Sequence, residues 1–145
     1  PGFWKATGGK GDYLLVNVVN GGNCPGNITP WTMKFVESYR KRWGLEPEGY
    51  GTSSSYMAVY QLKEAIEKVN SLDTDKVVKG LEDIDIMGVY GRMRFDKKTH
   101  QIIPSFDPKE GAVTCIFQWQ QGDRVQVFPG KVARGKVMLP PWVKK

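Results

Sequence analysis

The spacing of apolar residues along the chain predicts a mixed helix and strand organisation. An apolar, β-branched run at residues 12–19 is typical of a buried strand. Three stretches with apolar residues three or four positions apart follow it, and they predict helices that begin near Pro30, Ser53 and Asp73. From Ile86 onward the pattern changes to short apolar runs between polar turns, which indicates strands. This order predicts the α/β fold class.

Local sequence signals place the ends of these elements. A Gly-Gly pair at residues 8–9 can adopt the left-handed conformation that ends a short N-terminal helix. Thr29 can cap the helix that starts at Pro30, and Gly44 is positioned to end it. Near the C-terminus, a Gln-Gly-Asp turn at residues 121–123 separates two short apolar runs and predicts a hairpin.

The second long helix carries its apolar residues on one face, and this pattern predicts that the face is buried. The members of the face are Tyr56, Val59, Leu62, Ile66 and Val69. The apolar N-terminal strand is expected to have neighbours in a parallel sheet, whose two faces are normally covered by helices. Because the chain supplies too few elements for such a sheet, we expect an incomplete α/β unit.

The bulk composition is that of a folded globular protein. A hydrophobic fraction of 40% and a charged fraction of 25% argue against disorder. The net charge is +6, but the basic residues are scattered along the 145 positions, which argues against a nucleic-acid surface. No segment has the ~20 apolar residues that a membrane-spanning helix needs. The chain begins at Pro1 without an initiator methionine, so we expect a processed or truncated product.

The residue types that usually carry catalysis are isolated in this sequence. His100 is the only histidine and lies in a polar turn, so a solvated side chain explains it better than a general base. The acidic residues Asp96, Asp107 and Glu110 are typical of turns. The glycines at residues 8–11 precede a strand, whereas those of a phosphate-binding loop follow one. The sequence therefore predicts neither an enzyme nor a bound cofactor.

The two cysteines, Cys24 and Cys115, are too few and too far apart for a structural zinc site, which needs four ligands at short spacings. They can form one disulfide or stay as two thiols, and two thiols are favoured. No metal site is predicted.

The segment that leads into the second long helix, GYGTSSSY at residues 49–56, is a candidate ligand site. Its small residues leave backbone amides accessible at the positive end of a helix dipole, where a carboxylate can bind. Tyr56 combines an apolar ring with a polar tip, which suits a pocket wall or the edge of a core. Simple capping by Ser53 or Ser54 is the alternative, and the residues alone favour it.

Five segments, taken in order, resemble a single protein family. They are FWKATGGKGDYLLVNV, SSSYMAVYQLKEAIEKVNSLDTDKVVKGLEDID, GVYGRMRFDKKTHQ, IFQWQQGDRVQVFP and GKVMLPPW. Together they cover nearly the whole chain and resemble the C-terminal part of the type I periplasmic solute-binding proteins of branched-chain amino acid ABC transporters. Members of that family are more than twice as long as this chain, so the resemblance implies a partial fold.

The resemblance implies two α/β lobes that are joined by three crossover strands and close on a ligand between them. It implies that residues 1–17 end lobe two, that residues 18–109 form the C-terminal part of lobe one, and that residues 110–145 form the third crossover, a hairpin and a tail that return to lobe two. The implied hinge residues are Val18, Val19, Asn20, Gly21, Val113 and Thr114, and the implied ligand-binding residues are Gly51, Thr52, Ser53, Ser54 and Tyr56. Some leucine binders have a bulky aromatic residue near the position of Gly51, so the glycine hints at a larger or more polar ligand.

The function that the resemblance implies is capture of a small, amino-acid-like solute for import by an ABC permease, in the periplasm or outside the cell. Self-association or the missing N-terminal portion is expected to cover the apolar faces that this chain leaves exposed. A ligand-sensing receptor domain of the same fold is one alternative, and a basic nucleic-acid-binding domain is another.

Overall fold

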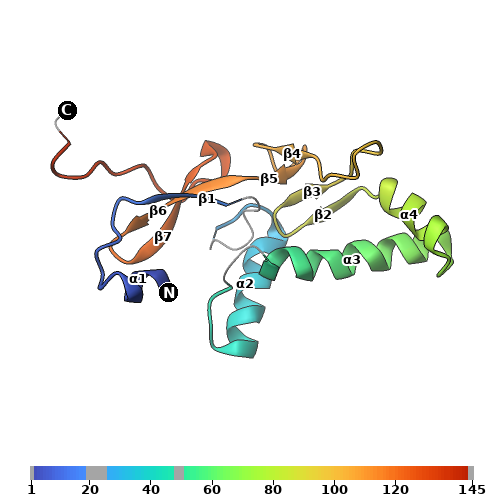
Figure 1. Ribbon diagram of the computed structural model, residues 1–145, viewed down its shortest axis with the longest axis horizontal. Coiled ribbons are helices and arrows are strands. Elements are labelled where there is room, and N and C mark those ends of the chain that lie inside the picture. Colours follow the sequence, from blue (N-terminus) through green and yellow to red (C-terminus); the bar gives the residue numbers. More distant parts are fainter. Residues whose placement is uncertain (1, 19–25, 48–50, 144–145) are drawn as a thin grey trace.

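Two β-sheets follow one another along the length of the molecule (Figure 1). The computed structural model describes residues 2–18, 26–47 and 51–143. One sheet has three antiparallel strands in the order β1-β6-β7, formed by Leu15–Val18, Cys115–Gln120 and Asp123–Phe128. The other has four strands in the order β2-β3-β5-β4, formed by Ile86–Gly88, Gly91–Met93, Ala112–Val113 and Pro104–Ser105. Only its β4–β5 pair is parallel among these described strands.

The prediction of parallel neighbours for the N-terminal strand is wrong. β1 runs antiparallel to β6, with Val18 opposite Cys115. The C-terminal hairpin supplies this partner, so no crossover helix is needed. The strand is also shorter and less buried than predicted, because Tyr13 adopts a φ of 69° and no described element covers Leu14 and Leu15, which are 45% and 50% exposed.

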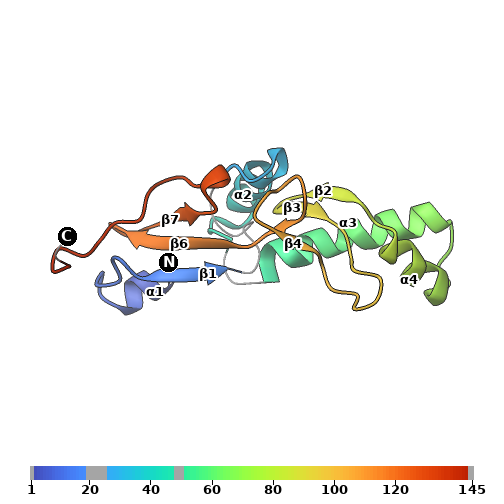
Figure 2. The same ribbon diagram turned by 90° about the horizontal axis from the view of Figure 1, so that it is seen from above.

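Helices pack mainly around the four-stranded sheet. The described helices are α1 (Gly2–Ala6), α2 (Pro30–Trp43), α3 (Gly51–Val69) and α4 (Thr74–Glu82), and the 3₁₀ helix η2 (Gly130–Val132) follows β7. Figure 2 shows that α3 runs along the four-stranded sheet and away from the three-stranded one. The predicted start and end of α2 are confirmed: the Thr29 side chain accepts a hydrogen bond from the Trp31 amide, and Gly44 ends α2 with a φ of 65°.

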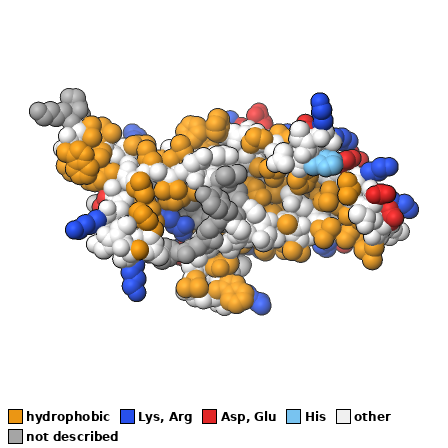
Figure 3. All heavy atoms as spheres, viewed as in Figure 1, with side chains coloured by type: hydrophobic (Ala, Val, Ile, Leu, Met, Phe, Trp, Pro, Cys, Tyr) orange, Lys and Arg blue, Asp and Glu red, His pale blue; other side chains and the backbone are white. Residues whose placement is uncertain are grey.

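The packed face of α3 differs from the predicted one. Its buried residues are Ser53, Met57, Gln61 and Ala65, which lie four positions apart. The predicted face is largely open: Tyr56, Val59 and Leu62 are exposed, and Ile66 and Val69 are half-buried. Figure 3 shows hydrophobic side chains on the surface of both halves of this face, including the half that contains α3 and α4. The more apolar stripe of α3 is therefore largely exposed, as the resemblance to a longer fold implied.

Two separate hydrophobic clusters meet at β5. Ala112 belongs to the cluster between α2, α3 and the β2–β3 hairpin, whereas its neighbour Val113 belongs to the cluster around β6. The chain then passes through Thr114 into β6 and so crosses from the four-stranded sheet to the three-stranded one. The junction between the sheets is thus a short connection with a distinct core on either side.

Candidate functional site

The candidate ligand residues lie in the first two turns of α3. The helix begins at Gly51, two residues before the predicted start, and it begins near the middle of the molecule's long axis (Figure 1). The side chain of Ser53 is completely buried, while Gly51 is exposed and Thr52 and Ser54 are partly exposed. A ligand beside this helix start would therefore reach Gly51, Thr52 and Ser54 rather than Ser53.

Two tyrosine phenols lie beside this helix start. Burial raises the pKa of Tyr90, and a hydrogen bond between its phenol and the Ser54 side chain lowers the pKa in part. Partial desolvation of the Tyr56 phenol together with a 3.2 Å hydrogen bond to the Tyr60 phenol raises the pKa of Tyr56 to about 12. Both phenols are neutral at physiological pH, so they offer hydrogen bonds and ring faces rather than charge.

Tyr90 connects the start of α3 to the crossover. Its side chain contacts Ser54, and its carbonyl accepts a 2.7 Å hydrogen bond from the Val113 amide, one residue before Thr114. Val18, another predicted hinge residue, is buried opposite Cys115 just beyond that crossing. The remaining predicted hinge residues, Val19, Asn20 and Gly21, lie outside the described residues. Cys24 does too, so the state of the two cysteines stays a prediction.

A cavity of about 470 Å³ separates α1 and the β6–β7 turn from the C-terminal end of α2. We call it the α1–α2 cavity, and its lining residues are Trp4, Lys5, Arg40, Glu46, Trp119, Gly122, Asp123 and Arg124. The Arg40 guanidinium donates two hydrogen bonds to Glu46, of 2.6 and 3.0 Å. The Arg124 guanidinium approaches the Pro47 carbonyl from the other side at 3.5 Å. The sequence did not predict this cavity, because its walls come from three distant segments.

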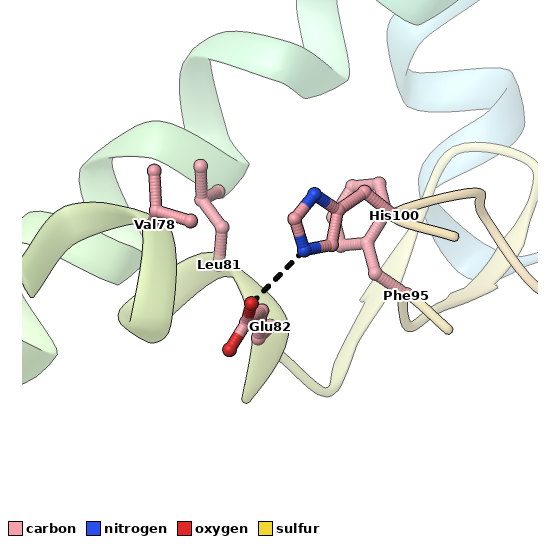
Figure 4. A pocket seen from close by; sticks show the side chains of 5 residues that line it. All are labelled: Val78, Leu81, Glu82, Phe95 and His100. Atoms are coloured by element: carbon pink, nitrogen blue, oxygen red, sulfur yellow. Dashed lines mark hydrogen bonds and ion pairs between the residues drawn. The ribbon is translucent and has the colours of Figure 1, made fainter. Parts of the chain in front are cut away.

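A smaller apolar hollow lies at the far end of the molecule (Figure 4). It measures about 170 Å³ and is lined by Val78, Leu81 and Phe95, with Glu82 and His100 at its edge. The imidazole Nε2 of His100 lies 2.9 Å from a Glu82 carboxylate oxygen. The His100 side chain is 59% exposed, as predicted for a turn histidine, but its contact with Glu82 was not predicted. The hollow is remote from α3's first turn and is not part of the candidate site.

No group of three or more potential metal ligands occurs among the residues that the structure describes. In the same part of the chain, every helix is too short or too polar to cross a membrane.

Comparison with known proteins decides the family. The periplasmic binding protein family model matches residues 4–114. The chain belongs to this family. Leu/Ile/Val-binding protein homolog 7 of Brucella melitensis is 30% identical over 114 residues, which are 79% of this chain and 28% of that protein.

Solved structures of periplasmic binding proteins share the fold. A branched-chain amino acid ABC transporter protein from Silicibacter pomeroyi superposes with a TM-score of 0.81 at 21% identity, over 97% of this chain and 38% of its own length. An ABC transporter substrate-binding protein from Desulfitobacterium hafniense in complex with Leu has a TM-score of 0.60 at 28% identity, over 86% of this chain and 33% of its own. The chain thus holds an α/β part of the periplasmic binding protein fold and spans about a third of these relatives.

Family membership confirms two predictions from the sequence. The resemblance to branched-chain amino acid binding proteins of ABC transporters is correct, and the family is one of binding proteins rather than enzymes. The boundaries at residues 17 and 109, the ligand contacts and the hinge residues stay predictions.

Proposed function

We propose that this chain is the C-terminal part of a substrate-binding protein that captures an amino-acid-like solute between two lobes and delivers it to an ABC permease. In this proposal the three-stranded sheet with α1 belongs to lobe two, and the four-stranded sheet with α2, α3 and α4 belongs to lobe one. The periplasm or the outer cell surface is the matching location, as the family name indicates.

The link through Tyr90 is the observation that carries this proposal. A single residue, Tyr90, links the start of α3, where the resemblance implies ligand contacts, to the crossover. The Ser54 side chain contacts the Tyr90 phenol, and the Tyr90 carbonyl accepts a hydrogen bond from the Val113 amide. A ligand that touches α3 can therefore influence the angle between the sheets, which a protein that closes on its ligand requires. The backbone amides of the first turn suit a carboxylate.

The size of residue 51 bears on the ligand class. A Cβ atom added to Gly51 would have as its nearest neighbour the Ser55 hydroxyl at 3.9 Å, which is ordinary contact distance. The helix start thus leaves open space where a larger side chain could stand. We infer that the ligand is bulkier or more polar than leucine, the ligand in the Desulfitobacterium hafniense complex.

Titration calorimetry on the full-length protein that carries this chain tests the proposal. L-Leucine, other amino acids, their amides, urea and aromatic acids would be titrated against the wild type and the Gly51→Trp variant. We expect one class bulkier or more polar than leucine to bind, and Gly51→Trp to weaken it at least about tenfold by filling the open space. Lys98→Trp, in an exposed turn, is the control and should bind normally. Tight leucine binding without affinity for bulkier compounds would contradict the ligand class, and no binding at all would contradict the function.

A further inference from the structure

The two sheets are also linked by side chains at a second place, away from the α1–α2 cavity. There the loop between β4 and β5 meets the end of β7 and the η2 helix. The rings of Phe106 and Phe128 are 5.0 Å apart and nearly perpendicular, and Lys131 forms an ion pair with Asp107. We call these four residues the rear contact. A shallow hollow of about 450 Å³ lies between the same two segments.

The rear contact and the α1–α2 cavity lie on opposite sides of the crossover. In Figure 1, β4 and the turn after β7 lie above the strands that join the sheets, whereas α1 and α2 lie below them. Figure 2 shows η2 facing the loop that follows β4 across the same junction. The connection through Thr114 therefore lies between the rear contact and the α1–α2 cavity. It can act as the axis of a rotation that changes both.

We propose that the rear contact limits ligand affinity by holding the two lobes in their open arrangement. This inference rests on the proposed function, because it requires lobes that close on a solute. Phe106, Asp107, Phe128 and Lys131 would then be affinity-determining residues that never touch the ligand.

The position of the rear contact opposite the cavity decides whether it raises or lowers ligand affinity. A rotation about the crossover that narrows the α1–α2 cavity moves the segments on the opposite side apart. The α1–α2 cavity measures about 470 Å³ while the rear contact is formed. A rotation that narrows this cavity further would break the rear contact, so a ligand that binds the narrower arrangement works against the strength of the rear contact.

The aromatic pair carries most of the expected effect. A T-shaped aromatic pair shifts such an equilibrium about twofold to tenfold. The ion pair keeps both charges at neutral pH, since its hydrogen bond lowers the pKa of Asp107 and raises that of Lys131. The Lys131 side chain is 69% exposed, so solvent screens much of the attraction and the ion pair adds little.

Binding and scattering measurements on the full-length protein test this inference. Phe106→Ala and Phe128→Ala should each tighten the binding of the best solute from the panel above, with L-leucine as the common reference probe, by about twofold to tenfold. The double variant should bind no more tightly than the tighter single one, since both substitutions remove one contact. Trp142→Ala is the matched control, because it also removes an exposed aromatic ring. The ring partner of Trp142 is Tyr13 at 5.9 Å, which adjoins the same three-stranded sheet, so this contact does not join the two sheets and affinity should not change.

Small-angle X-ray scattering without ligand separates this inference from the proposed function. Ligand-free Phe106→Ala and Phe128→Ala should be more compact than the wild type, whether or not any solute in the panel binds. Affinities that weaken or stay equal in both phenylalanine variants, or an unchanged radius of gyration in protein that keeps its circular dichroism spectrum, would overturn it.

Discussion

Gly91 is the position where the fold is least able to accept a side chain. It stands at the start of β3, pairs with Ala112 of β5, and has a φ of +123°. A Cβ atom at this position would lie 2.2 Å from the Gly111 carbonyl oxygen, far inside contact distance, and 3.3 Å from the Val113 amide nitrogen. These neighbours are backbone atoms of the strand that leads into the crossover, so they cannot rotate out of the way.

The cost of Gly91→Ala can be worked out from these two features. A φ of +123° is a conformation that residues with a side chain rarely adopt, and forcing it costs about 1–3 kcal/mol. Moving packed backbone to relieve the overlap costs about 1–3 kcal/mol more. We therefore expect the free energy of unfolding to fall by about 2–6 kcal/mol, a large share of the usual stability of a domain. Gly44→Ala isolates the first effect, because Gly44 has a φ of +65° with no neighbour within 4 Å and should cost about 1–2 kcal/mol.

Urea denaturation of the full-length protein, followed by tryptophan fluorescence and circular dichroism, measures both variants. The decisive quantity is the difference between them, since any general effect of replacing a left-handed glycine is common to both. If Gly91→Ala lowers stability no more than Gly44→Ala, the close approach of β3 to the strand before the crossover is not real.

Three further predictions concern polar side chains. Thr32→Val should lower the free energy of unfolding by about 1–3 kcal/mol, measured by urea denaturation, because the buried hydroxyl donates a 2.6 Å hydrogen bond to the Val89 carbonyl; a change below about 0.5 kcal/mol would contradict this. Gln126→Met should raise it by a similar amount, because Gln126 is fully buried and neither polar atom of its carboxamide has a partner among the described residues; a loss of stability would show that the amide is needed. Tyr56→Phe should remove a phenol that ionises at about pH 12 in an absorbance titration. Because the unfolded phenol ionises near 10.0, stability falls between these two pH values in the wild type, and the variant should lose less of it.

Local chemistry made the helix ends and the family predictable from sequence. Thr29 and Gly44 act within one turn of the backbone, so their roles do not depend on distant residues. The order of motifs along the chain was likewise sufficient to predict a partial periplasmic binding protein fold, because family patterns survive truncation.

The packed face of α3 and the neighbours of β1 were not predictable in the same way. The buried face of α3 includes the polar residues Ser53 and Gln61, whereas its more apolar face around Val59 is exposed, so apolar periodicity alone selects the wrong face. β1 reads as a buried strand because its sequence is apolar, yet its partner β6 lies about 100 residues further along the chain, beyond the reach of any local pattern. The α1–α2 cavity and the rear contact were missed for the same reason.

These misses have a common cause that bears on function. The exposed residues Val59 and Leu62, like Leu14 and Leu15, lie in apolar runs that a sequence pattern assigns to a core, yet no described element covers them. Exposed apolar stripes of this kind usually become interfaces. The crossover is different, because Val18 and Val113 are buried and the Val113 amide donates a hydrogen bond to the Tyr90 carbonyl within this chain. The described part of the junction between the sheets therefore has buried contacts of its own, and it is there that the proposed closing motion and its rear contact would act.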